Sequence, residues 1–262
     1  MAMDWLIREH GLFLAFWGAM ILLGAVEFLV PQFPDNADRR RRWPTNFGLG
    51  ILNGLIASSV PALTVASAWW AARSGFGLLN WLAAPAWLAL IATLVVKSLG
   101  QYSFHRLSHK VGLLWRLHRV HHSDVHLDIS SALRTHPLEM IASILFMIPL
   151  VVVCGLPPIV LAAYETAELF ANILTHANVR IPDRVERLAR ALLVTPSLHR
   201  LHHSAVQIET DSNYGNVVSI WDRLFRTYRG EAVEPGSFRF GLDDVSRERA
   251  EDLGAQLGLP WR

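Results

Sequence analysis

The sequence predicts an all-α integral membrane protein, a bundle of about three transmembrane helices and a helical hairpin beneath a cytoplasmic, histidine-rich helical cap. Of its 262 residues, 52% are hydrophobic and only 18% are charged. Soluble domains carry a charge at nearly a quarter of their positions, so this composition favours a membrane environment. Several apolar stretches also approach the roughly 20 residues that a helix needs to cross a bilayer.

Three apolar stretches are long enough for this, at residues 11–30, 47–70 and 83–104. Acidic Asp4 and Glu9 precede the first stretch and no small-residue cleavage site follows it, so we expect a retained helix and not a signal peptide.

A fourth apolar region, residues 138–175, is interrupted by the sequence CGLPP at 154–158. Both prolines block helix continuation. We therefore expect a helical hairpin with arms at 138–153 and 159–175.

The arginines of the short loops predict the orientation. Arg39–Arg42 lie between the first two stretches, and only Arg73 lies between the second and third. Loops rich in basic residues stay on the cytoplasmic side, which puts the four arginines there and the N-terminus outside. Because the hairpin makes an even number of passes, His105 and His176 emerge on the same cytoplasmic face.

We expect N-terminal transmembrane helices in residues 1–82, a catalytic region in residues 83–230 and a polar tail of unassigned function in residues 231–262. Lys97 and Lys110 are the only lysines among 24 basic residues, which is typical of GC-rich bacterial genomes and points to a bacterial inner membrane.

The cysteine count and the net charge argue against sulfur-based sites and against a nucleic-acid partner. The single cysteine, Cys154, excludes an intrachain disulfide and a thiolate metal cluster. A net charge of only +2 argues against a nucleic-acid partner.

One phrase occurs twice, as LHRVHHS at 117–123 and as LHRLHHS at 198–204, and HRLSH at 105–109 precedes both. Residues three and four apart share a helix face, so the histidines of each phrase are expected to converge. They are His105, His109, His118, His121, His122, His199, His202 and His203. Eight imidazoles exceed the needs of one tetrahedral zinc, so we expect two metal ions, with three ligands from each seven-residue phrase. Imidazole suits zinc, copper, iron and nickel alike.

Two polar stripes run towards these histidines through apolar sequence. They comprise Lys97, Gln101, His105 and His109 on one helix, and Glu165, Glu168, Asn172 and His176 on another. A ligating histidine needs a partner for its second ring nitrogen. We expect Glu165 and Glu168 to supply such partners, the alternative being a structural pairing with arginine.

The ordered motifs HRLSH (105–109), LHRVHH (117–122), RTHPLE (134–139) and LHRLHH (198–203) resemble the sterol desaturase / fatty acid hydroxylase superfamily. The segment NYGNVVSIWDRLFRTY (213–228) is similar to the closing segment of that family. The likeness covers roughly residues 85–230.

The resemblance implies a non-haem di-iron enzyme that uses O2 and an external ferredoxin- or cytochrome-type electron donor to hydroxylate or desaturate a lipid. Carried over to this chain, it implies nine ligands, the eight histidines above and His176. Asn172 stands where a further ligand is expected. His136 either ligates metal or orients Glu139 and the substrate.

Two other functions fit a histidine-rich membrane protein. A zinc hydrolase predicts an HExxH helix with a glutamate base, which the sequence lacks. A metal transporter or non-catalytic metal-binding protein predicts ligands spread through the bilayer depth, whereas these cluster on one face. The choice of lipid, and of hydroxylation or desaturation, stays open.

Overall fold

The computed structural model describes residues 2–33, 39–59, 62–233 and 238–262. Within these ranges the chain is helical, and its only β contacts are isolated bridges. The longer helices are α1 (Ala2–Leu29), α2 (Arg39–Ser59), α3 (Ala62–Ser74), α5 (Ala86–Lys110), α6 (Gly112–His122), α7 (Pro137–Cys154) and α8 (Pro158–His176). The shorter ones are α4 (Leu78–Trp81), η1 (Ile129–Leu133), α9 (Asp183–Ala189), α10 (Pro196–His202), α11 (Gln207–Thr210), α12 (Ile220–Leu224), α13 (Arg247–Ala250), α14 (Leu253–Gly258) and η2 (Leu259–Trp261).

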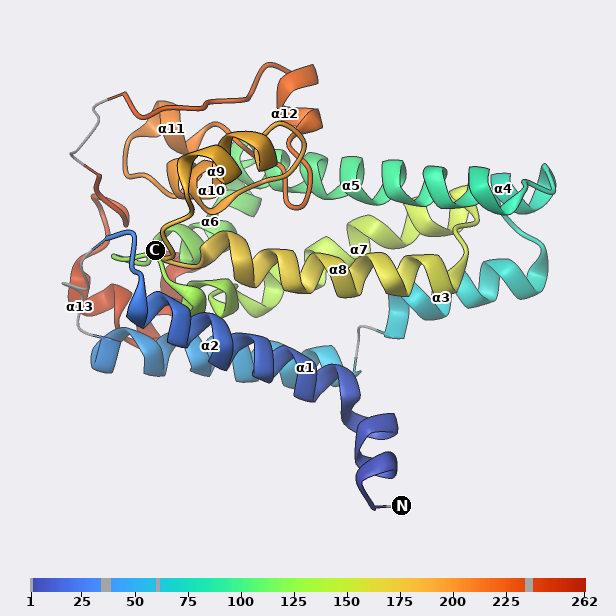
Figure 1. Ribbon diagram of the computed structural model, residues 1–262, viewed down its shortest axis with the longest axis horizontal. Helices are drawn as coiled ribbons and strands as arrows, with labels where there is room; N and C mark the ends of the chain where they lie inside the picture. Colours follow the sequence, from blue (N-terminus) through green and yellow to red (C-terminus); the bar gives the residue numbers. More distant parts are fainter. Residues whose placement is uncertain (1, 34–38, 60–61, 234–237) are drawn as a thin grey trace.

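Four helices, α3, α5, α7 and α8, form the centre of the bundle and run side by side in Figure 1. They enclose a core of small and branched residues that includes Ala68, Ala89, Val151 and Leu161. Helices α1 and α2 pack along one flank, and the short helices other than α4 lie towards one end of the bundle, with α4 at the opposite end. We call the end with the other short helices, residues 112–134 together with 177–262, the cap.

Three helices are long and apolar enough to cross a membrane, judged by length and composition, at Gly11–Leu29, Ala86–Lys110 and Pro137–Cys154. Large apolar side chains such as Ile21 and Leu145 are well exposed on them. Exposed apolar surface of this extent is typical of contact with lipid. The expected apolar stretches at 11–30 and 83–104 therefore form α1 and α5, which are candidate spans, and α7, the first arm of the hairpin, is a third candidate.

The expected helix at 47–70 includes residues 60 and 61, which lie outside the described residues. On either side of them, α2 ends at Ser59 and α3 begins at Ala62. Taken separately, neither of these described helices is long and apolar enough to count as a candidate span.

The predicted hairpin is confirmed in α7 and α8. Gly155 ends α7 in the left-handed conformation with φ +68°, and Pro158 occupies the first turn of α8. A Cβ atom on Gly77 would lie 2.5 Å from the Cα atom of Gly155, so two glycines allow the α3–α4 connection to touch the hairpin turn.

The C-terminal tail, read from sequence as polar and without function, packs into the cap. Its residues Val245, Ala250 and Leu259 share a hydrophobic cluster with Leu49 of α2 and Val120 of α6. The described part of the tail therefore closes the cap over the ends of α2 and α6.

Candidate metal centre

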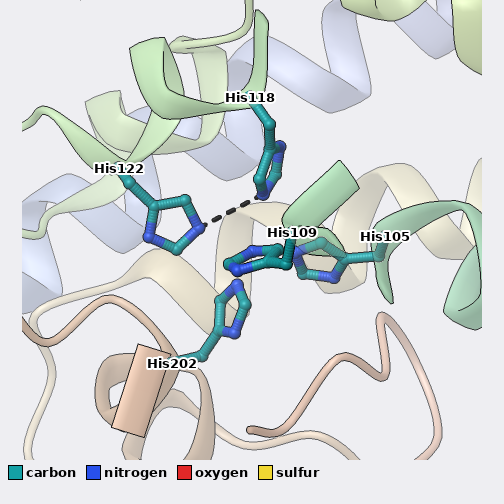
Figure 2. Close-up of side chains that lie close together, drawn as sticks. All are labelled: His105, His109, His118, His122 and His202. Carbon is teal, nitrogen blue, oxygen red and sulfur yellow. Dashed lines mark hydrogen bonds between the residues drawn. The ribbon is translucent and has the colours of Figure 1, made fainter. Parts of the chain in front are cut away.

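The nine predicted histidines lie together at the junction of bundle and cap, in two groups. The five-histidine group comprises His105, His109, His118, His122 and His202. The four-histidine group comprises His121, His176, His199 and His203. Within each group the ring nitrogens lie within 4.8 Å of one another. Figure 2 shows the rings of the five-histidine group turned towards a common centre from three parts of the chain.

Each seven-residue phrase divides its histidines between the two groups. His118 and His122 lie in the five-histidine group, whereas His121 lies in the four-histidine group. The expectation that all three converge on one side is wrong. Residues i and i+4 differ by about 40° around a helix, but consecutive residues differ by about 100°, so His121 faces away from His122. The second phrase is divided in the opposite sense, with His199 and His203 in the four-histidine group and His202 across from them.

Hydrogen bonds assign the tautomers of four of these rings. The Nδ1 atoms of His105 and His202 lie 2.9 and 2.7 Å from the carbonyl oxygens of Tyr214 and Ser212. The Nδ1 atoms of His121 and His176 lie 2.8 and 2.7 Å from those of Arg134 and Asn172. A carbonyl oxygen can only accept, so each Nδ1 carries the hydrogen and each neutral ring keeps a lone pair on Nε2.

The lone pairs of His121 and His176 point at one another. In the four-histidine group, Nε2 of His176 lies 3.2 Å from Nε2 of His121 and 3.0 Å from Nε2 of His199. Two lone pairs at this separation repel unless a cation lies between them. Nitrogen ligands about 2.1 Å from a metal are about 3.0–3.4 Å apart, which matches these distances.

In the five-histidine group, the Nε2 atoms of His105, His109 and His202 are buried with no hydrogen-bond partner among the described residues. Buried polar atoms are rarely left without a partner, so these are best explained as ligands. Burial, reinforced by neighbouring histidines, lowers the pKa of His122, His202 and His203 well below the usual value. Neutral imidazole is the form that binds metal, so both groups fit a cation.

A carboxylate supports one of these rings. Oε1 of Glu139, in the first turn of α7, lies 2.5 Å from Nδ1 of His118, and its Oε2 is buried without a partner. A carboxylate in this position fixes the ring and makes the ligand more basic.

Glu165 and Glu168, which we expected in that role, have other partners. Glu165 pairs with Lys97 at 3.0 Å, and Glu168 accepts hydrogen bonds from Gln101 and Asn216. The two polar stripes thus pair with each other, Lys97 with Glu165 and Gln101 with Glu168. In the part of the chain that the structure describes, neither glutamate pairs with a histidine or an arginine.

His136 and Asn172 stand beside the groups and belong to neither. His136 caps α7, where its Nδ1 accepts from Leu138 N, and its Nε2 donates to Leu257 O at 3.3 Å. Asn172 donates to Ala132 O through its amide, while its own backbone carbonyl holds His176.

A cavity of about 440 Å³ adjoins both groups. Its wall includes His105 and His118 of the five-histidine group and His121 and His199 of the four-histidine group. Helices α2, α5, α7 and α8 supply most of the remaining lining, where apolar residues such as Met140 and Ile144 mix with the polar Gln101 and Glu168. A molecule in this cavity would contact both groups.

A buried ionic network that sequence reasoning missed supports the four-histidine group. Arg134 is fully buried and donates to Val120 O, Ser123 Oγ, Asn46 Oδ1 and Ala250 O. Arg134 is the first residue of the RTHPLE motif, but a role was predicted only for His136 and Glu139 of that motif.

Arg42 completes the network and pairs with Asp124 at 2.7 Å and with Asp128 at 2.9 Å. Arg42, one of the four arginines expected in a cytoplasmic loop, is thus buried against the cap.

Comparison with known proteins agrees with this arrangement. Residues 90–227 match the fatty acid hydroxylase family, a span that contains all nine histidines. The chain is 35% identical to alkylglycerol monooxygenase from Danio rerio over 148 residues, 56% of this chain and 31% of the relative. It is 34% identical to ornithine lipid hydroxylase OlsE from Rhizobium tropici over 178 residues, 68% of this chain and 51% of the relative.

A further relative, methylsterol monooxygenase 1 from Gallus gallus, is 30% identical over 153 residues, 56% of this chain and 50% of the relative. The chain thus spans between about a third and about half of the length of these relatives. No solved structure gives a significant match. Because the family match covers more than half of the chain and contains both histidine groups, the chain belongs to the fatty acid hydroxylase family.

Proposed function

We propose that this protein is a membrane-bound non-haem di-iron oxygenase that hydroxylates a lipid. The observation that carries the proposal is the cavity shared by the two histidine groups, beside helices suited to a bilayer. The named relatives include monooxygenases and a hydroxylase, which favours hydroxylation over desaturation.

The two histidine groups would each hold one iron, one through His105, His109, His118, His122 and His202, the other through His121, His176, His199 and His203. The chemistry that bound iron supplies is the reductive activation of O2 and the oxidation of an unactivated C–H bond. The overall reaction is RH + O2 + 2 e⁻ + 2 H⁺ → ROH + H2O. The family, and not the donor atoms, favours iron, because imidazole binds several metals.

The surrounding residues prepare the site for this reaction. Glu139 holds the ring of His118, and the carbonyl oxygen of Arg134 holds that of His121, so both rings keep their Nε2 atoms towards the other histidines of their groups. Met140, Ile144 and Leu169 give the lipid an apolar wall, and Gln101 and Asn172 offer it hydrogen bonds. The cavity thus offers a lipid both apolar contacts and polar groups.

We place the cap on the cytoplasmic side of a bacterial inner membrane. Arg39–Arg42 begin α2 at the same end of the bundle as the histidines. Positively charged segments favour that side. The two electrons come from a separate ferredoxin- or cytochrome-type donor.

Oxygen isotope incorporation tests this function. Purified protein, reconstituted with iron and a bacterial lipid extract, is reduced chemically and supplied with ¹⁸O2. The expected product is a lipid heavier by one ¹⁸O atom. The variant Ile144→Trp should retain its metal and lose the product, because the larger side chain fills part of the cavity. A native protein that binds iron but labels no lipid, or labels it with oxygen from water, would contradict the proposal.

A further inference from the structure

Trp115 joins the five-histidine group to the surface of the cap. Its ring centroid lies 5.2 Å from that of His109, 5.7 Å from that of His122 and 6.4 Å from that of His118. The same side chain is partly exposed. A path from solvent to three of the candidate ligands therefore crosses a single aromatic side chain.

Trp115 is on the side of the five-histidine group. The three histidine rings that it contacts, His109, His118 and His122, all belong to that group. An electron that arrives through Trp115 therefore reaches the five-histidine group first.

The surface around Trp115 is the junction of α5 and α6, which we call the junction surface. Its exposed apolar residues are Leu107, Val111 and Leu113, the last of which is 65% exposed. Exposed basic side chains flank them at Arg106, Lys110 and Arg116. An apolar centre with a charged rim is the usual anatomy of a protein interface.

Acidic groups offset only part of this positive charge. Asp211 pairs with Lys110 at 2.8 Å, and Asp244 pairs with Arg119. Asp222 also interacts with Arg106, so four basic side chains, Arg106, Lys110, Arg116 and Arg119, stand against three acidic ones. The excess is positive, and the surface is complementary to an acidic partner.

We propose that the junction surface docks a small, acidic one-electron carrier protein, and that its electrons pass through Trp115 to the metal of the five-histidine group. The proposal rests on the proposed function, which consumes two electrons for each lipid. Each docking event oxidises the carrier by one electron and reduces the metal by one, so two events serve one turnover.

The rate of carrier oxidation tests the proposal. A soluble, negatively charged [2Fe–2S] ferredoxin is supplied reduced, without oxygen, to the iron-loaded protein, and its oxidation is followed by stopped flow. For the native protein the bimolecular rate should fall as salt is added, since screening weakens steering between opposite charges. Arg106→Glu with Arg116→Glu should lower that rate about tenfold or more at low salt.

Matched variants identify the surface. Arg184→Glu with Arg187→Glu makes the same change of charge at exposed sites on α9 and should leave the rate unchanged. Trp115→Leu should slow electron transfer at saturating ferredoxin while the dependence on salt persists. All variants should keep the metal content of the native protein and its reduction by dithionite.

The proposal is overturned if reversal at Arg106 and Arg116 leaves the rate unchanged, or if the α9 reversal lowers it equally. It is also overturned if the native protein turns over with dithionite but accepts no electrons from ferredoxin. Hydroxylation driven by dithionite separates this failure from that of the proposed function, because it requires iron, oxygen and lipid but no docking surface.

Discussion

The Nδ1 atom of His121 donates to the carbonyl oxygen of Arg134 at 2.8 Å, and the side chain of the same arginine donates to the carbonyl oxygen of Val120 at 2.8 Å. One residue thus holds both the ring of a candidate ligand and the helix end that carries it. The four-histidine group depends in this way on a residue that contacts no metal site directly.

Replacing Arg134 by methionine should therefore damage both stability and the four-histidine group. The change leaves three buried acceptors without the arginine donor, on Ser123, Asn46 and Ala250, while Val120 O keeps its hydrogen bond from Ser123 Oγ. Unsatisfied buried groups cost about 1–3 kcal/mol each, so unfolding should become easier by about 3 kcal/mol or more. Thermal unfolding in detergent measures this, with the exposed Arg187→Met as control. Equal stability of the two variants would refute the role of Arg134 in holding the end of α6.

The same network predicts a loss of stability in acid. Burial raises the pKa of Asp124, but the charges of Arg42 and Arg134 lower it by more, and the net pKa lies below the usual range. An aspartate whose folded pKa is depressed stabilises the fold above its unfolded pKa of about 3.9, and this contribution disappears as the pH falls further. Unfolding temperatures from about pH 7 to about pH 2.5 should show the drop below about pH 4.

Asp124→Asn isolates the effect from the protonation of buried histidines, which both proteins share. The variant should be less stable at neutral pH and should lose less stability below about pH 4 than the native protein. Parallel curves for native protein and variant would show that Asp124 does not carry the acid dependence. The exposed Asp183→Asn should match the native curve.

Glu139 should matter through His118. Losing the partner of a ligating histidine typically costs about 10–100-fold in metal affinity or activity, and Glu139→Ala should fall in this range. Glu139→Gln keeps an oxygen acceptor for Nδ1 and should lose less. Metal affinity is measured by competition with a chelator, with the exposed Glu248→Gln as control. A loss of metal affinity in Glu139→Gln, with native affinity in Glu139→Ala, would contradict a role for this hydrogen bond.

The unequal size of the two groups predicts that adjacent histidines differ. His202→Ala leaves four histidines in the five-histidine group, whereas His203→Ala leaves three in the four-histidine group. A closed site usually needs four protein ligands, so after treatment with chelator His203→Ala should lose about one metal per chain more than His202→Ala. Elemental analysis decides this, and equal losses would count against the division into these groups.

Much of this arrangement could be predicted from local pattern. The hairpin followed from Gly155 and the prolines after it, and the gathering of nine histidines followed from repeated spacing. These features depend on neighbours within about four residues, which sequence displays directly.

What escaped prediction depends on long-range packing. The division of each phrase between two groups follows from the angle between His121 and His122, yet which partner each ring meets is decided by how α6, α8 and α10 pack. The burial of Arg42 against Asp124 joins residues 82 positions apart, and the exposed-looking run of arginines gave no sign of it. The packing of the tail likewise could not be predicted, because its few apolar residues find their cluster only in the folded cap.

Metal content is the most direct test of the central claim that two histidine groups hold two irons. Detergent-purified native protein should contain about two irons per chain, and the double variant His121→Ala, His202→Ala, which removes one ring from each group, should lose most of both. One zinc per chain, or a metal content that the two substitutions leave unchanged, would contradict the di-iron centre.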